Sequence, residues 1–299
     1  MSSPPAVTGA STIERLPMTL PRLVEKKRLG EPIVMVTAYD FPGAQVAEEA
    51  GVDLVLVGDS GGQVVLGYDS TVPVSVDEML MLSAAVRRGL RTPLLVGDLP
   101  FGSYEASDEQ AVATAQRFVK RAGCDAVKLE RGGSSVARAR AIVEAGIPVM
   151  GHVGLTPQTA TALGGYRAQG RTADRALRVA HDALALQEAG CFSLVFEAIP
   201  AAVATELMPR LDVPVIGIGA GGAVDGQVLV FHDLLGMGDG MAPRFVKRYA
   251  ALRGEMIGAV RAFADDVRAG RFPGPEHTYS IDPEELTGFR AGIAGLEAP

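Results

Sequence analysis

Short apolar runs rich in valine, isoleucine and leucine recur eight times along the middle of the chain. Most of these runs lack the alternation of polar and apolar residues that marks a strand with one face in water. We therefore predict strands that are buried on both faces. The eight predicted strands are residues 33–39, 54–59, 94–99, 126–130, 149–154, 193–198, 213–221 and 228–233.

Stretches with helical spacing of apolar residues separate most of these strands. One predicted helix follows Ser75 and another follows Ser107, because serine is a favoured N-cap residue. Residues 135–148 and 175–191 show the same spacing, and several such stretches end in glycine just before the next strand. Eight alternations of strand and helix predict a single-domain α/β fold, a (β/α)8 barrel of the TIM type.

An open, doubly wound sheet is the alternative fold, since it shows the same alternation of strands and helices. The interval between the last two predicted strands is a weak point of the prediction. Residues 222–227 are too few for a crossover helix, so one of these two strand assignments is expected to be displaced.

The two ends of the chain differ from the predicted barrel. The first residues are mainly small or proline and suggest a mobile tail. Thr19 is expected to cap a helix that ends at Gly30, and a helical stretch over residues 245–270 is expected to close the barrel. The predicted division is a tail at 1–17, a catalytic barrel at 18–272 and a tail at 273–299.

Composition and charge argue against several classes of protein. The 299 residues carry a net charge of -7, whereas a nucleic-acid-binding protein usually has a basic face. No apolar run reaches the roughly 18–20 residues of a membrane helix, and the first residues lack the pattern of a secretory signal. Cys124 and Cys191 are predicted to be buried free thiols, so a cytoplasmic location is expected.

Polar residues gather where the predicted strands end. In a (β/α)8 barrel the carboxyl ends of the strands form one mouth, which is the usual place for an active site. An acid in such a position often does no more than cap the next helix, and this simpler interpretation remains open for each residue taken alone. The strand-end residues are Tyr39, Asp40, Asp59, Ser60, Asp98, Lys128, Glu130, His152, Glu197 and the glycines at 219–221.

Three of the strand-end acids suggest a metal site. Asp59, Asp98 and Glu130 would repel one another if they met at the mouth, unless a cation or protonation relieved the repulsion. Carboxylates without an accompanying cysteine favour Mg²⁺ over zinc. The alternative is a set of helix caps and surface ion pairs.

Lys128 and Glu130 are two residues apart in the fourth predicted strand, so their side chains should share the interior face of the barrel. A buried lysine requires an anionic partner, here either Glu130 or the carboxylate of a substrate. A structural ion pair with no role in binding is the alternative.

Two further strand-end residues have chemistry suited to an active site. His152 is placed to form a hydrogen bond to a substrate, although a lone histidine is as often a core residue. Glu197 follows a very apolar strand, so burial is expected to raise its pKa toward that of a general base at neutral pH. A helix cap or a buried ion pair is the alternative for Glu197. The loop GIGAGG at 217–222 resembles a phosphate-binding loop only weakly.

Ten sequence blocks together resemble the ketopantoate hydroxymethyltransferase family of pantothenate synthesis. The resemblance covers about residues 18–277, and the departures include Arg131, which follows Glu130 directly. The blocks are TAYD at 37–40, VGDSGG at 57–62, GYDSTVPV at 67–74, AVRRG at 85–89, DLPFGSY at 98–104, VKLERGG at 127–133, GHVGLTPQ at 151–158, GGYRAQGR at 164–171, PVIGIGAG at 214–221 and DGQVLVFHDLLG at 225–236.

The resemblance implies a (β/α)8 barrel, assembled as a homodecamer, that uses Mg²⁺. It implies transfer of a hydroxymethyl group from 5,10-methylenetetrahydrofolate to 3-methyl-2-oxobutanoate, which gives 2-dehydropantoate. Asp59 and Asp98 resemble the metal ligands of that family, with Glu130 completing the site directly or through water. Ser60 and Lys128 resemble its contacts to the oxoacid carboxylate, and Glu197 resembles its proton acceptor. Partners other than these small molecules and further copies of the chain are not expected.

Two other functions compete with this one. A lyase or mutase of the phosphoenolpyruvate mutase and isocitrate lyase type would also use a barrel, Mg²⁺ and an oxoacid enolate. Such proteins are expected to carry a KKCGH-like loop, and this sequence has none. A non-catalytic barrel that senses an oxoacid or a metal would be expected to lack one of the site groups.

Overall fold

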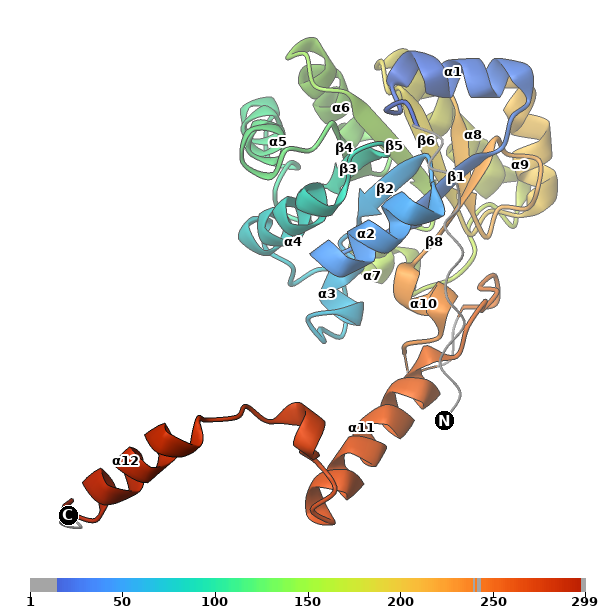
Figure 1. Ribbon diagram of the computed structural model, residues 1–299. Helices are drawn as coiled ribbons and strands as arrows, with labels where there is room; N and C mark the ends of the chain where they lie inside the picture. The colour runs from blue at the N-terminus through green and yellow to red at the C-terminus, as the bar shows by residue number, and fades with distance from the viewer. Residues whose placement is uncertain (1–14, 239, 241–242, 297–299) are drawn as a thin grey trace. The chain divides into compact units, whose positions relative to one another are not determined.

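A computed structural model describes residues 15–238, 240 and 243–296 of the chain, and it contains a closed barrel of eight parallel strands (Figure 1). Each strand pairs with the next in sequence, and the last pairs with the first. This confirms the (β/α)8 barrel and excludes the open sheet. The strands are β1 Ile33–Thr37, β2 Leu54–Val57, β3 Leu94–Asp98, β4 Ala126–Glu130, β5 Val149–Gly154, β6 Ser193–Glu197, β7 Val215–Ile218 and β8 Gly226–Leu229.

The helices of the barrel region follow the predicted caps. Thr19, Ser75 and Ser107 each accept a hydrogen bond from the first turn of their helices, and Ser75 forms a full capping box with Glu78. The helices are α1 Leu20–Leu29, α2 Phe41–Ala50, α3 Gly61–Val64, α4 Val76–Gly89, α5 Asp108–Ala122, α6 Ser134–Glu144, α7 Ala160–Leu163, α8 Ala173–Glu188, α9 Ala201–Leu207 and α10 Phe231–Leu235, with short 3₁₀ turns η1 Pro157–Thr159 and η2 Met208–Arg210.

The predicted position of the eighth strand, 228–233, is two residues too late. The strand begins at Gly226, and the chain enters α10 at Phe231, whose backbone N–H donates to Oγ1 of Thr37 at 2.9 Å. Gly226 is required because a Cβ there would lie 2.4 Å from the carbonyl oxygen of Ile33. Glycine lowers the apparent strand propensity of the segment, so the apolar run alone places the strand wrongly.

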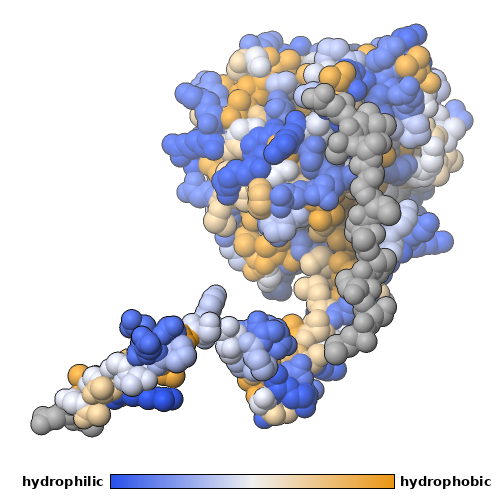
Figure 2. Space-filling view, in the orientation of Figure 1, coloured by the Kyte–Doolittle hydropathy of each residue, from blue (hydrophilic) through white to orange (hydrophobic). Residues whose placement is uncertain are grey.

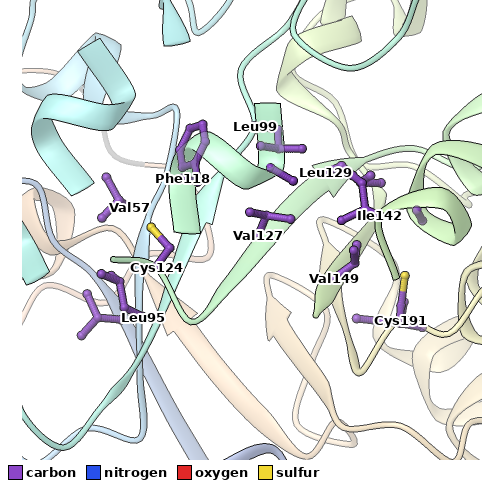
Figure 3. Packing of buried hydrophobic residues seen from close by; sticks show 14 of the residues in the cluster. Val57, Leu95, Leu99, Phe118, Cys124, Val127, Leu129, Ile142, Val149 and Cys191 are labelled. Carbon is purple, nitrogen blue, oxygen red and sulfur yellow. The ribbon is translucent and has the colours of Figure 1, made fainter. Parts of the chain in front are cut away.

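Two apolar layers hold the barrel together. The interior layer consists of alternate strand residues such as Met35, Leu56 and Val96, and Leu23 of α1 joins it. The outer layer packs the other face of the strands against the helices, and Figure 3 shows Phe118 and Cys124 beside the strands in this layer. Cys124 and Cys191 are both free and buried, as predicted, and burial raises the pKa of each thiol to about 12.

The chain divides into two compact units, the first ending at Ala250 and the second beginning at Ala251. The second unit contains α11 Leu252–Arg268, η3 Pro275–His277 and α12 Pro283–Ile293. The closing helix expected over 245–270 therefore begins later than predicted and is not grouped with the barrel. The segment before α11 contacts α10 instead, since the N–H of Tyr249 donates to the carbonyl of Leu234 at 2.8 Å.

No residue of α11 is buried. Figure 2 shows hydrophobic residues beside hydrophilic ones in the second unit. The exposed large apolar residues of α11 are Met256, Ile257, Val260, Phe263 and Val267. The domain boundaries predicted at residues 17 and 272 remain predictions, and most of the predicted N-terminal tail lies outside the described residues. Within the described part of the chain no helix has the length and apolar character needed to cross a membrane.

We predict that Gly97→Ala destabilises the barrel, because an added Cβ would lie 2.5 Å from Phe118 Cδ1 and 2.8 Å from Cys124 Sγ. Overpacking of this kind should lower the free energy of unfolding by about 1–3 kcal/mol, measured by urea denaturation. Gly222→Ala is the control, since nothing lies within 4 Å of its added Cβ. Equal effects of the two substitutions would contradict this account of the packing.

Candidate functional site

The site residues continue the interior face of the barrel. In β3 the side chains of Leu94, Val96 and Asp98 alternate with outward-facing ones, and in β4 Lys128 and Glu130 occupy the same phase. Asp98 is the register partner of Lys128, and Glu130 is that of His152. The lower interior of the barrel is therefore apolar, and its last layer toward the carboxyl ends of the strands is charged.

This charged layer forms the floor of a cavity of about 190 Å³. All of the predicted site residues line it, so the structure brings them together from five strands or strand ends. They are Asp59, Ser60, Asp98, Lys128, Glu130, His152 and Glu197, and further lining residues include Thr71, Tyr166 and Phe245.

Lys128 is paired chiefly with Asp98. Its Nζ lies 2.7 Å from both carboxylate oxygens of Asp98 and 3.6 Å from Oε1 of Glu130. Asp98 was not among the partners expected from the sequence, which were Glu130 or a substrate. Burial alone would lower the pKa of Lys128, but the charges of Asp98 and Glu130 outweigh it and raise that pKa, so the lysine is charged.

His152 lies between two carboxylates. Its Nδ1 is 3.3 Å from Oε1 of Glu130, and its Nε2 is 3.3 Å from Oε2 of Glu197. Burial and the charge of Lys128 lower the pKa of His152, but the two carboxylates outweigh them and raise it to about 9. The raised pKa favours a charged ring at neutral pH, which lies between Glu130 and Glu197 as an ion-pair partner of both, since neither ring nitrogen has a hydrogen-bond partner among the described residues.

Asp59 and Asp98 form a pair of acids with excess negative charge. Burial, together with the charges of Asp98 and Glu130, raises the pKa of Asp59 well above its usual range, and burial raises that of Asp98. The backbone N–H of Asp59 donates to Oδ2 of Asp98 at 3.2 Å, so the two residues are adjacent. An all-oxygen pair of this kind suits a hard divalent cation such as Mg²⁺, which is often held by only one or two carboxylates.

Glu130 is less suited to direct metal binding. Its Oε2 accepts the N–H of Gln158 at 3.1 Å, and its Oε1 faces His152 and Lys128. These contacts lower its pKa despite burial, with Lys128 the largest favourable contribution. In the described part of the chain no three His, Cys, Asp or Glu side chains are grouped as a metal site. The predicted set of three ligands thus remains a prediction, and the donor set fits a site of two carboxylates.

Gln158 connects the acids, and the sequence pattern did not identify it. Its Nε2 donates to Oδ2 of Asp59 at 3.0 Å and to the carbonyl of Leu99 at 2.9 Å. Its Oε1 accepts from the hydroxyl of Tyr104 at 2.7 Å. Gln158 ends the block GHVGLTPQ, but an uncharged residue in a loop gives no signal of its own. Its side-chain amide holds Asp59 and its backbone N–H holds Glu130, so this one residue fixes the separation of the two acids.

The contact made by Ser60 indicates that its side chain is oriented by a neighbour and does not cap a helix. Its Oγ lies 2.8 Å from the hydroxyl of Tyr39, in hydrogen-bond contact, and makes no capping bond to α3. Asp40, by contrast, is a helix cap, since its Oδ1 accepts the N–H of Gly43 at 2.7 Å. Thr71 was also missed, and its buried hydroxyl lines the cavity with no partner among the described residues.

Glu197 is more open than its apolar neighbours in sequence suggest, with 16% of its side chain exposed beside the cavity. Ala198, directly after it, has φ 49°, and Arg131, directly after Glu130, has φ 75°. No other non-glycine residue in the described part of the chain has positive φ. Such conformations are disfavoured and occur mostly at functional sites, so the two strand ends are held in place at a cost to stability.

The glycine-rich loop after β7 is explained by packing. A Cβ at Gly219 would lie 2.6 Å from Cδ1 of Phe245, and one at Gly221 would lie 2.5 Å from Cβ of Ala201. Both glycines also have positive φ. The loop therefore allows Phe245 to lie over the cavity, and the weak phosphate-loop interpretation gains no support.

Comparison with known proteins agrees with this geometry. A sequence profile of the ketopantoate hydroxymethyltransferase family matches residues 17–275. The chain belongs to this family. A 3-methyl-2-oxobutanoate hydroxymethyltransferase of Moorella thermoacetica is 53% identical over 89% of this chain and 99% of the relative. A mitochondrial one from Arabidopsis thaliana is 53% identical over 93% of this chain and 82% of the relative.

Solved structures of other enzymes share the fold. A phosphonopyruvate hydrolase in complex with oxalate and Mg²⁺ superimposes with a TM-score of 0.58 at 15% identity, covering 93% of this chain and 97% of that one. A 2,3-dimethylmalate lyase gives 0.55 at 17% identity, covering 93% and 98%. At this level of identity the likeness concerns the fold alone.

We predict that Gln158→Met weakens metal binding, because Asp59 loses the amide that favours its charged form. Loss of such a supporting contact typically costs roughly 10–100-fold in metal affinity, and isothermal titration with Mg²⁺ would measure it. Gln110→Met is the matched control, since its amide binds the carbonyl of Gly102 at 3.0 Å, in a loop that does not line the cavity. Equal affinities of wild type and Gln158→Met would refute the role given to Gln158.

Proposed function

We propose that this member of the family transfers a hydroxymethyl group from 5,10-methylenetetrahydrofolate to 3-methyl-2-oxobutanoate, giving 2-dehydropantoate. The observation that carries the proposal is the convergence of acids from β2, β3, β4 and β6, with Lys128 and His152, on one cavity in a chain of this family. The names of relatives 53% identical to this chain support the same activity.

The oxoacid is held by cations and hydroxyls around the cavity. Lys128 and Ser60 are assigned to its carboxylate, and Tyr39 orients Ser60 through the 2.8 Å contact between their hydroxyls. Asp59 and Asp98 would hold Mg²⁺, with Glu130 behind them. The bound ion would act as a Lewis acid that stabilises negative charge on the keto oxygen. A solved Mg²⁺ complex with the same fold supports this choice of metal.

Glu197 is assigned as the base that removes the proton from C3 of the oxoacid. Its carboxylate lines the cavity, and the cationic ring of His152 fixes it at 3.3 Å. Proton removal by a positioned base contributes typically about 10²–10⁴-fold to a rate. The resulting carbon nucleophile forms a bond to the one-carbon unit of the folate, and water supplies the hydroxyl group of the product. The two C–N bonds of that unit break, and tetrahydrofolate leaves with the proton from C3 and one proton of the water. His152 is therefore assigned as a positioning residue between Glu130 and Glu197.

The remaining parts of the proposal concern assembly and location. We propose a homodecamer of the 31.1 kDa chain in the cytoplasm. The exposed apolar residues of α11 support association with further copies, since such residues usually mark an interface when they are grouped. Bacterial relatives without a named organelle support the cytoplasm, whereas the plant relative is mitochondrial.

We predict that Glu197→Gln abolishes deuterium exchange at C3 of 3-methyl-2-oxobutanoate, followed by NMR with Mg²⁺ and without folate. The amide has nearly the same shape as the carboxylate but cannot accept the proton, so the exchange rate should fall by at least about 10²-fold. Binding of the oxoacid should persist, which titration of the variant with Mg²⁺ and oxoacid would check. Exchange at the wild-type rate would move the base elsewhere.

We predict a different loss for Asp98→Asn. Removing this carboxylate weakens the metal pair and also leaves the charge of Lys128 without its main partner, since both oxygens of Asp98 lie 2.7 Å from Nζ. The variant should therefore lose Mg²⁺-dependent binding of the oxoacid while its binding of the folate persists. Calorimetry with and without Mg²⁺ would measure both. Oxoacid binding that keeps its full dependence on Mg²⁺ would exclude Asp98 as a ligand.

A further inference from the structure

A second cavity, of about 470 Å³, lies next to the site at the carboxyl end of β5. It is lined by the loop after β4, the end of β5, the turn η1 and the first half of α8. Thr156 and Thr159 line it, whereas Pro157 between them lines the barrel-mouth cavity. A single short turn thus separates the two cavities.

Three arginines face this second cavity. Arg131, Arg175 and Arg178 line it, and the only acid in its lining is Asp182. Among the described residues none of the three guanidinium groups has a hydrogen-bonding or ion-pair partner. Three unpaired arginines in a protein of net charge -7 mark a site for an anion with more than one negative charge.

The backbone links this cavity to the catalytic layer. Arg131 is held in the disfavoured left-handed conformation, and its N–H donates to the carbonyl of His152 at 2.9 Å, which ties the cavity to the catalytic layer. Gly132 and Gly133 line the cavity where α6 begins, and the carboxylate of Asp182 faces the backbone N–H of Gly133 there, which leaves the arginines as the groups free to bind an anion.

The barrel-mouth cavity is too small for both substrates. Its volume of about 190 Å³ is below the roughly 300–1,000 Å³ typical of sites that enclose a drug-sized ligand. A folate carries its one-carbon unit at the pteridine end and its carboxylates at the glutamate end, separated by a benzoyl linker. With the pteridine end at the barrel mouth, the glutamate end must lie on the rim.

We propose that the second cavity binds the glutamate tail of the folate co-substrate, with Arg131, Arg175 and Arg178 contacting its carboxylates. This inference rests on the proposed function, in which methylenetetrahydrofolate is the one-carbon donor. The three arginines are binding residues that set the affinity for folate and its dependence on tail length. They take no part in proton removal from the oxoacid.

The test compares 5,10-methylenetetrahydrofolate carrying one glutamate with the form carrying three. The variants are the double substitution Arg175→Gln with Arg178→Gln, and Arg131→Gly, which removes the charge while glycine accepts the left-handed backbone. The control is Arg121→Gln, an exposed arginine near the end of α5 that lines neither cavity. For each protein we would measure KM for both folates, KM for the oxoacid and folate-independent exchange at C3.

We expect wild type and the control to prefer the triglutamate, and the double variant to lose this preference with a rise of about tenfold in its KM. Arg131→Gly should show a smaller rise in the same direction. KM for the oxoacid and the exchange at C3 should not change. Unchanged folate KM values in the double variant, with normal exchange, would overturn this inference and leave the proposed function intact.

A free phosphate shares the chemistry of a carboxylate tail. Inorganic phosphate that inhibits wild type but not the double variant, with equal KM for the two folates in wild type, would assign the cavity to phosphate and overturn the inference. Absence of folate-dependent turnover in wild type would overturn the proposed function itself, and with it the assignment of the cavity to a folate tail.

Discussion

The site depends on the buried ion pair between Lys128 and Asp98. Both residues are nearly inaccessible to water, and the lysine contacts both oxygens of the aspartate at 2.7 Å. Such a pair is costly to desolvate and gives little net stability, but removal of either partner leaves an isolated buried charge. The pair therefore keeps a charged lysine and an ionisable aspartate in the interior, where a small anionic substrate can meet them.

The backbone contributes a second constraint. Residues directly after Glu130 and Glu197 adopt left-handed conformations that non-glycine residues rarely take. In each case a hydrogen bond to the neighbouring strand anchors the residue. The N–H of Arg131 donates to the carbonyl of His152 at 2.9 Å, and the N–H of Ala198 donates to the carbonyl of Ile218 at 2.8 Å. The strand thus ends sharply after its carboxylate, and the acid points into the barrel while the chain turns away toward the rim.

Much of this site could be predicted from the sequence, because a charged residue in an apolar strand is costly to bury unless it pairs or binds a ligand. Asp98, Lys128 and Glu130 are such residues, and the barrel places them together. The part that could not be predicted depends on contacts between distant segments. The Lys128–Asp98 partnership follows from strand register, and Gln158 acts from a loop that no periodicity marks. The start of β8 at Gly226 could not be predicted either, because the close approach of Gly226 to Ile33 is visible only in the fold.

The charges around the cavity make a divalent ion better suited to it than a proton. The charged layer on the floor of the cavity holds four carboxylates, those of Asp59, Asp98, Glu130 and Glu197, beside Lys128 and His152, and Asp233 of α10 adds a fifth carboxylate to the lining. With the four acids of this layer ionised, two negative charges are left uncompensated there, and burial together with the charges of Asp98 and Glu130 raises the pKa of Asp59. A proton on Asp59 would relieve half of this excess charge and would remove a charged oxygen that could bind a metal ion. A divalent cation would neutralise the excess of this layer without adding a proton to any of its carboxylates, which suits the role proposed for Glu197 as the base.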